Sequence, residues 1–393
     1  MIKREHYLSL IRPFYDSDLI KIITGIRRCG KSVILNQIKE ELKKEGKEVL
    51  SLDFEDASVL YKIDTEKKLL NFIQEKKSSK KLYIFLDEIQ RLDNWASACR
   101  TIRLYNCSLF ITGSNSKLLS HEFTKELSGR YVSFKIRPFV YKELKEYALQ
   151  LNKDITISDY LIWGGFPKRI EFDTLQSQKL YLNDLNETII INDIISRYNI
   201  KKIDLFRKLT DYILLSNSRI FSVRSILKYI NNTNIHCSIN TLIKYINYLQ
   251  EAFIIDAVKI YSSKTKSVLN YYQKLYDEDV SFNSLRVFNN QFDITHNLEN
   301  IVYNELIYRG YSLQTYNNNN KEIDFIAIKN NKQYFIQVTY TLAEKKTYDR
   351  EFSAFKNIDN NNQKIIISND DFDYSTSTIK HISLKQFLEL EDL

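Results

Sequence analysis

The pattern G-x-x-x-x-G-K-S at residues 25–32 is the feature of this sequence that most constrains its fold. An apolar run at 19–25 precedes it, as expected of a buried β-strand, and an amphipathic stretch at 31–45 follows it, as expected of a helix. The chain of 393 residues contains 8 glycines and 3 prolines, so glycine is expected where the backbone requires it. A strand, a glycine-bounded loop and a helix in this order predict a loop that surrounds phosphate with backbone N–H donors.

The residue types of this loop suit a nucleoside triphosphate bound together with Mg²⁺. Lys31 is expected to reach the β- and γ-phosphates of ATP, and the Ser32 hydroxyl is expected to bind Mg²⁺. Two arginines of the loop, Arg27 and Arg28, either stabilise phosphate charge or lie solvated. The candidate nucleotide contacts in this segment are Gly25, Arg28, Cys29, Gly30, Lys31, Ser32 and Val33.

An acidic pair, Asp87 and Glu88, ends a second apolar run at 81–88. Two carboxylates at the carboxyl end of a buried strand are the arrangement known as Walker B. Asp87 is expected to hold Mg²⁺, usually through water, and Glu88 is expected to polarise the attacking water as general base. Together with the phosphate loop, this pair predicts a site that hydrolyses ATP.

Two further residues are catalytic candidates beside Glu88. Asn115 follows the apolar run at 107–114 and is placed to lie between the acidic pair and the γ-phosphate. Arg130 precedes the next predicted strand and is too distant from its own phosphate loop to serve it easily. It is therefore expected to act as an arginine finger in the site of a neighbouring subunit, which implies a homo-oligomer. Plain turn and surface roles stay open for both residues.

The pattern of apolar runs divides the chain into an α/β part, a helical part and a second α/β part. Strands alternate with helices as far as Pro138, which predicts a parallel sheet covered on both faces. Residues 140–262 are mostly helical, and 221–262 have the helices and hairpin of a winged helix-turn-helix. Strands and helices alternate again from residue 299.

Several segments together resemble the AAA+-type ATPases of bacteria and archaea that carry a C-terminal domain of unknown function. The segments are GIRRCGKS, LYIFLDEIQ, ITGSNSKLL, LSGRY, GGFP, QKLYDED and EIDFIAI. The resemblance covers nearly the whole chain. It implies an α/β fold with a P-loop αβα ATPase core (1–150), a helical lid (151–218), a winged-helix segment (219–265) and a smaller restriction-endonuclease-like domain (266–393). It also implies that Pro167 of the lid packs near the adenine.

A second set of polar residues lies in the last third of the chain. Glu299 on a helix, Asp324 on a strand and Gln337 on the following strand have the order and spacing of a metal-dependent nuclease site. The position of the usual lysine holds Thr339, however, and Gln337 is a neutral and weaker metal ligand than a carboxylate. A lysine from elsewhere stays open, with Lys345, Lys346 and Lys364 as candidates. We therefore expect a retained fold without cleavage rather than an active nuclease.

Composition and charge exclude some classes of protein and leave others open. No apolar run approaches the ~20 residues that span a bilayer, and the N-terminus lacks the apolar core of a signal peptide. The four cysteines have no metal-ligand spacing, so a cytoplasmic protein with reduced thiols is expected. The net charge of +8 permits contact with DNA without requiring it. Basic residues of the winged-helix segment either face phosphates or form a solvated surface.

The sequence thus predicts a cytoplasmic, oligomeric, Mg²⁺-dependent ATPase whose macromolecular client it does not name. Three alternatives stay open at this stage. The first is a slow, nucleotide-switched assembly module in defence or regulation. The second is a nuclease that ATP powers or gates. The third is a nucleotide or sugar kinase, against which Glu88, Asn115 and Arg130 argue.

Overall fold

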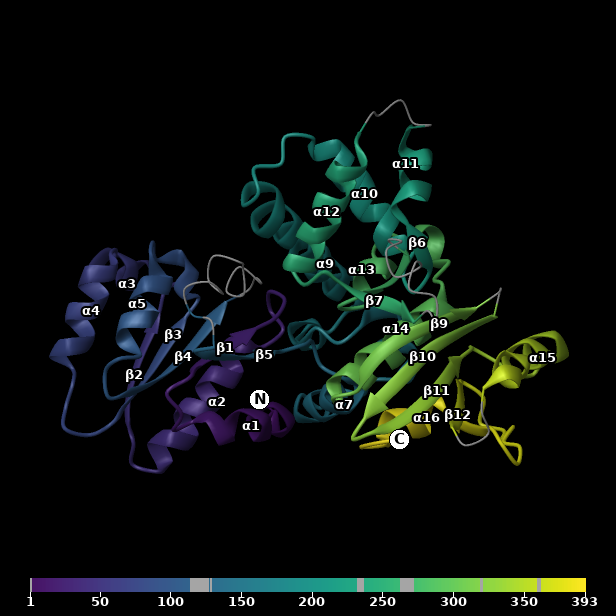
Figure 1. Cartoon of the computed structure of the whole chain (residues 1–393), viewed down its shortest axis with the longest axis horizontal. Coiled ribbons are helices and arrows are strands. Elements are labelled where there is room, and N and C mark those ends of the chain that lie inside the picture. Colours follow the sequence, from purple (N-terminus) through teal and green to yellow (C-terminus); the bar gives the residue numbers. More distant parts are fainter. Residues whose placement is uncertain are drawn as a thin grey trace. The chain divides into compact units, whose positions relative to one another are not determined.

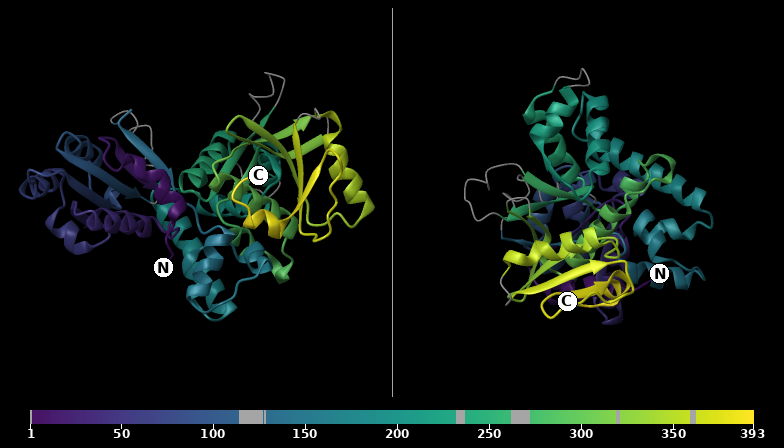
Figure 2. Two further views of the ribbon diagram at one scale, coloured as in Figure 1. Left: turned by 90° about the horizontal axis from the view of Figure 1, so that it is seen from below. Right: turned by 90° about the vertical axis from the view of Figure 1, so that its right-hand side faces the viewer.

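The computed structural model describes residues 2–113, 127, 129–231, 237–261, 272–318, 321–358 and 362–393. They form two compact units, which Figures 1 and 2 show in purple to blue and in teal to yellow. The first unit is Met1–Pro138 with Glu251–Phe253, and the second is Phe139–Gln250 with Ile254–Leu393. Among the described residues, none of the helices has the length and apolar character needed to cross a bilayer.

The first unit is built on a five-stranded sheet in the order β2-β3-β4-β1-β5. All four neighbouring pairs are parallel, as the sequence predicts for this part of the chain. The strands are β1 (Ile20–Thr24), β2 (Glu48–Asp53), β3 (Leu82–Asp87), β4 (Cys107–Gly113) and β5 (Tyr131–Lys135). Since the strands are parallel, all their carboxyl ends meet at one edge, where ligands bind in folds of this kind.

Helices cover both faces of this sheet (Figure 1). They are α1 (Glu5–Ile11), α2 (Lys31–Lys44), α3 (Ala57–Lys62), α4 (Glu66–Glu75) and α5 (Trp95–Ile102). Side chains of α4 and α5 pack with Ile84 and Leu86 of β3 in one apolar cluster. The intervening Phe85 points to the other face, where its ring stacks on Phe110 at 4.7 Å between centroids. This alternation explains why β3 is apolar along its whole length up to Asp87.

The second unit contains a mixed eight-stranded sheet in the order β13-β12-β11-β10-β9-β7-β8-β6. Its strands are β6 (Ile220–Ser222), β7 (Ile255–Tyr261), β8 (Tyr272–Asp277), β9 (Ser312–Asn318), β10 (Lys321–Lys329), β11 (Lys332–Val338), β12 (Gln363–Ser368) and β13 (Lys380–Ser383). The parallel pair β7–β9 joins the hairpin β7–β8 to the C-terminal strands. The boundary expected at 265–266 therefore falls between two strands of one continuous sheet.

The second unit also contains ten α-helices among its described residues, some before the sheet strands in sequence and some between them. They are α7 (Tyr141–Gln150), α8 (Ile157–Trp163), α9 (Leu175–Thr188), α10 (Ile203–Leu215), α11 (Val223–Asn231), α12 (Ile239–Glu251), α13 (Ser281–Ser284), α14 (Ile294–Tyr308), α15 (Lys345–Ala354) and α16 (Leu384–Glu389). Of these, α14 packs against β8, β9 and β11, and α15 packs against β10. Side chains of β8, β10 and α14 can therefore meet, although their segments are separated in sequence.

Candidate nucleotide site

The predicted phosphate loop connects β1 to α2 and depends on both of its glycines. Gly25 has φ +144° and Gly30 has φ +104°, a backbone region that side chains disfavour. A Cβ atom on Gly25 would lie 2.1 Å from the carbonyl oxygen of Ile136, so no larger residue fits there. The loop then enters α2 directly at Lys31, with Gly30 as the N-cap residue. A helix N-terminus without a side-chain cap thus follows the loop, and its first N–H groups have no partner within the helix, as anion binding requires.

The Lys31 side chain lies inside the loop and is 5% exposed. Its Nζ donates to the carbonyl oxygens of Gly25 and Ile26, each at 3.1 Å. The same Nζ lies 3.9 Å from Oε1 of Glu88, which comes from the end of β3. The fold therefore brings the lysine of the loop and the second acid of the predicted Walker B pair together.

Asp87 lies beside Ser32 and Thr112 at the carboxyl edge of the sheet. The hydroxyls of Thr112 and Ser32 both hydrogen-bond to the Asp87 carboxylate. Burial raises the pKa of Asp87, and these two hydrogen bonds oppose the rise. Thr112 Oγ1 also accepts from the backbone N–H of Glu88 at 2.9 Å. One threonine therefore holds both acids of the pair.

Thr112 belongs to the predicted strand end 112–115, from which the sequence predicts a catalytic role for Asn115 rather than for Thr112. The residue is fully buried near the end of β4, the strand between β1 and β3. A buried hydroxyl needs a hydrogen-bond partner, and the neighbouring strand β3 ends beside Thr112 in Asp87. Asn115, the residue chosen from this segment, lies outside the described residues.

Glu88 adopts a backbone conformation that is unusual for a residue with a side chain. Its φ of +50° lies in the left-handed region, which costs of order 1–3 kcal/mol for a non-glycine residue. Its Oε2 accepts a hydrogen bond from Nε2 of Gln90. Such outliers concentrate at functional sites, because the surrounding structure must hold them in place.

The N-terminal segment contributes to the site through Arg4, which no sequence motif indicated. Arg4 is 1% exposed, and its Nη1 donates to the carbonyl oxygen of Cys29 at 3.0 Å. The amide of Gln37 on α2 holds the backbone of this segment at Ile2 and Arg4. Residues before the first strand thus support the phosphate loop.

Arg130 lies at the opposite edge of the sheet from the phosphate loop. It is exposed, and it directly precedes β5, whose first residue pairs with Ile20 at the start of the parallel strand β1. Gly25 follows the other end of β1. Five residues of strand thus separate the start of β1, beside Arg130, from the phosphate loop, which is a distance of roughly 16 Å. Arg130 therefore cannot serve its own loop, and its predicted role in a neighbouring subunit stays a prediction.

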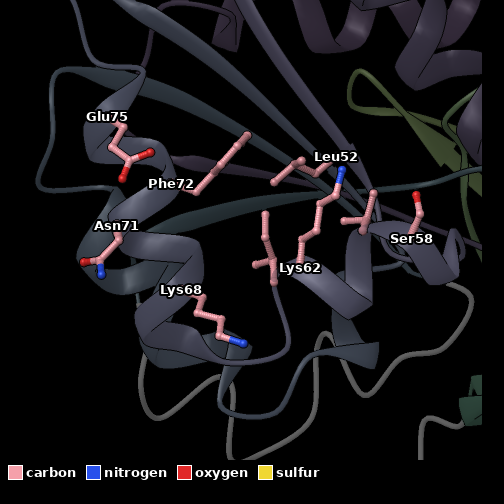
Figure 3. A pocket seen from close by; sticks show the side chains of 9 residues that line it. Leu52, Ser58, Lys62, Lys68, Asn71, Phe72 and Glu75 are labelled. Carbon is pink, nitrogen blue, oxygen red and sulfur yellow. The ribbon is translucent and has the colours of Figure 1, made fainter.

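The remaining predicted contacts lie in the loop and the first turn of α2. Cys29 is buried, Arg28 is exposed with φ +66°, and Val33 is half-buried. A separate hollow of about 430 Å³ lies between β2, α3 and α4, with Leu52, Lys62 and Phe72 among its lining residues (Figure 3). It includes no predicted nucleotide contact.

Comparison with known proteins places this site in a family. A family model described as an AAA domain matches residues 17–145, and models of two domains of unknown function, DUF8612 and DUF4143, match 155–289 and 295–387. A protein of Haemophilus influenzae, described as uncharacterized, is 32% identical over 379 residues, which cover 94% of this chain and 93% of that protein. The chain belongs to this family of AAA-domain proteins.

A second relative, a protein of Methanocaldococcus jannaschii described as uncharacterized, is 31% identical over 375 residues, which cover 90% of this chain and 82% of that protein. The Walker-type ATPase PABY2304 of Pyrococcus abyssi is 17% identical, with a TM-score of 0.44 over 73% of this chain and 96% of its own. The AAA-domain match confirms the predicted AAA-type assignment of residues 17–145, and the strand pairing confirms the α/β fold with a parallel sheet. The restriction-endonuclease-like assignment stays a prediction.

The second unit of this AAA-domain protein contains Pro167, the predicted adenine contact. Pro167 begins a 3-10 helix after Gly164 and Gly165. A Cβ on Gly164 would lie 1.8 Å from Oδ1 of Asp279, and the N–H of Gly165 donates to Oδ2 of Asp279 at 2.7 Å. Close packing against Asp279 is thus the physical reason for Gly164, whereas a Cβ on Gly165 would lie 1.9 Å from the carbonyl oxygen of Phe139.

Proposed function

We propose that this AAA-domain protein binds ATP and hydrolyses it in a Mg²⁺-dependent reaction. The observation that carries the proposal is the convergence of Lys31, Asp87 and Glu88 at the carboxyl edge of one parallel sheet. If the phosphate-loop motif had arisen by chance, there would be no reason for its buried lysine, Lys31, to lie beside Glu88, which follows a strand two positions away in the sheet. The AAA-domain match over residues 17–145 supports the same conclusion.

The residues at this edge suit Mg²⁺, which prefers oxygen ligands and keeps several waters. The Ser32 hydroxyl and the Asp87 carboxylate are hydrogen-bonded to each other, so both can reach one small cation. These two residues would hold it. When bound, Mg²⁺ would neutralise charge on the β- and γ-phosphate oxygens.

The chain's own residues supply the other requirements of hydrolysis. The Lys31 ammonium places positive charge inside the loop, where the β- and γ-phosphates are expected. The Glu88 carboxylate accepts a proton from the attacking water as general base. Thr112 restrains the backbone of Glu88 and the carboxylate of Asp87 together, so the two acids keep a fixed relative position.

Two variants, Lys31→Ala and Glu88→Gln, separate ATP binding from ATP hydrolysis, and a third serves as the control. Lys31→Ala should lose nucleotide binding or hydrolysis, whereas Lys44→Ala, an exposed lysine of the same helix, should change neither. Glu88→Gln should keep ATP affinity and lose roughly 10²–10⁴ in turnover, the size of a general-base contribution. Unchanged hydrolysis in purified Lys31→Ala would refute the proposal. The same assay with duplex DNA tests whether DNA is a partner.

A further inference from the structure

A buried lysine lies at the centre of the polar cluster in the second unit. Lys274 on β8 has a side chain that is 3% exposed. Its Nζ lies 2.7 Å from Oε1 of Glu299 on α14, 2.7 Å from Oε1 of Glu322 on β10, and 3.0 Å from Oδ1 of Asp324 on β10. One ammonium group therefore contacts three carboxylates from two other elements.

The residues that the sequence offered as a second metal site do come together here. Oε1 of Gln337 accepts from the backbone N–H of Asp324 at 2.9 Å, and its Nε2 donates to Oε2 of Glu351 at 2.6 Å. Asp324 also accepts from the backbone N–H of Val338, through Oδ2 at 2.9 Å. The amide oxygen of Gln337, the one atom through which it would bind a metal, is thus used within the protein.

The carboxylate of Glu299 is also held by contacts within the protein. Its Oε1 accepts from Lys274 and from the hydroxyl of Tyr276, each at 2.7 Å. Burial acts to lower the pKa of Lys274, but the charges of Asp324, Glu299 and Glu322 outweigh it and raise this pKa. The cation of the cluster is therefore the protein's own ammonium.

This donor set does not fit a divalent cation while Lys274 is present. Mg²⁺ needs near-octahedral oxygen ligands around its own position, whereas Nζ of Lys274 fills the position that the oxygens of Glu299, Glu322 and Asp324 share. Over the part of the chain that the structure describes, no three acidic, histidine or cysteine side chains are arranged to hold a metal. Thr339, at the usual lysine position, is buried and donates its backbone N–H to Ile367.

We infer that Lys274 takes the place of the metal ion in this cluster, so that the second unit is a metal-free scaffold without nuclease activity. The ammonium joins β8, which belongs to the hairpin after α12, to α14 and β10 of the C-terminal segment. Its function is to hold these elements together through buried ion pairs. Removal of the lysine would leave three carboxylates facing one another without their cation, an arrangement that is strongly destabilising.

Thermal unfolding of the full-length chain with and without Mn²⁺ tests this inference. All variants carry Asp87→Asn, which removes the carboxylate expected to hold a cation in the nucleotide site, and no nucleotide is added. A failure of the proposed ATPase function is therefore not confused with a failure of this inference. With Lys274 present, the unfolding temperature should not respond to Mn²⁺. Lys274→Ala should lower it by roughly 5–15 °C, and Mn²⁺ should restore part of the loss by occupying the vacated centre. Lys259→Ala, an exposed lysine on β7, is the matched control and should resemble the parent.

A direct binding measurement covers the case in which Lys274→Ala does not fold. Electron paramagnetic resonance of Mn²⁺ added to the folded Asp87→Asn protein should detect no site that a further Asp324→Asn substitution removes. A tightly bound Mn²⁺ that disappears in Asp324→Asn would overturn the inference. So would Mn²⁺- or Mg²⁺-dependent DNA cleavage that survives further purification and is lost in Asp324→Ala.

Discussion

The guanidinium of Arg4 donates a hydrogen bond of 3.0 Å to the carbonyl oxygen of Cys29, a residue 25 positions later in the phosphate loop. In a trans peptide the C=O of one residue and the N–H of the next point in opposite directions. A carbonyl of Cys29 that faces Arg4 therefore turns the N–H of Gly30 away from Arg4. This contact links the N-terminal segment to the orientation of a donor in the loop.

Arg4→Met should therefore weaken ATP binding while leaving the turnover of bound ATP nearly unchanged. Loss of a hydrogen bond from a charged donor is worth about 1.5–3 kcal/mol, which corresponds to roughly 10- to 100-fold in affinity. Titration with ATP and separate determination of kcat and KM check this split. Arg4→Lys, which keeps a donor, should recover part of the affinity.

The matched control for Arg4 is Arg12→Met in the same N-terminal segment. Arg12 pairs with Glu5 and Glu41, both of which lie outside the loop. This variant should keep the affinity of the parent. Equal losses in both variants would mean that the segment acts through overall stability rather than through the Cys29 carbonyl.

Thr112→Val should raise the Mg²⁺ concentration needed for half-maximal hydrolysis by roughly 10- to 100-fold, the usual effect of removing an outer partner of a metal ligand. The substitution keeps the shape of the side chain and removes the hydroxyl shared by Asp87 and the Glu88 backbone. Thr112→Ser should behave like the parent in the same Mg²⁺ titration. An unaltered Mg²⁺ requirement in Thr112→Val would place this hydroxyl outside the metal site.

Arg130→Ala should bind ATP normally, because Arg130 lies at the opposite end of β1 from its own phosphate loop. It should hydrolyse ATP poorly, because Arg130 is expected to act as an arginine finger in the site of a neighbouring subunit. Mixing Arg130→Ala with Lys31→Ala should restore part of the activity, since a mixed interface joins an intact loop to an intact arginine. Steady-state hydrolysis of the mixture, with the assembly state measured by mass, checks this expectation. A confirmed mixed oligomer without rescue would exclude catalysis in trans.

Lys21 should make the stability of the first unit depend on pH. Its Nζ is buried and donates to Oγ of Ser108 at 2.7 Å and to the carbonyl of Ser17 at 3.1 Å. Burial lowers its pKa to about 7, whereas in the unfolded chain a lysine keeps a pKa of about 10.4. Between these values the unfolded chain binds the extra proton, so the free energy of unfolding rises with pH, by up to about 1.4 kcal/mol per pH unit.

Replacing Lys21 should remove this pH dependence. As the pH rises from 7 towards 10, the free energy of unfolding of the parent should increase relative to that of Lys21→Met. Below pH 7 the difference between the two should be constant, because both states then hold the proton. Urea unfolding at several pH values measures the difference, with Lys44→Met as the exposed control. A difference that stays constant from pH 7 to 10 would contradict the expected titration.

The sequence alone was sufficient for the phosphate loop and the parallel sheet around it. Gly25, Gly30 and Lys31 act within eight residues, and strand-like and helix-like patterns flank them directly. Asp87 and Glu88 could be added because the carboxyl ends of parallel strands meet at one edge, whatever the helices between them do. These are local patterns combined with one general rule of sheet geometry.

Tertiary structure decided which side chains complete each site. Arg4 reaches the loop from before the first strand, and Lys274 reaches Asp324 from 50 residues away through the pairing of β7 with β9. The sequence offers Lys345, Lys346 and Lys364, which all follow Gln337, as candidates for the missing lysine, because the order of a motif gives information only along the chain. A buried charge instead takes the partner that lies nearest in space, since an unpaired charge in the interior costs several kcal/mol, and only the packing of distant segments sets that distance.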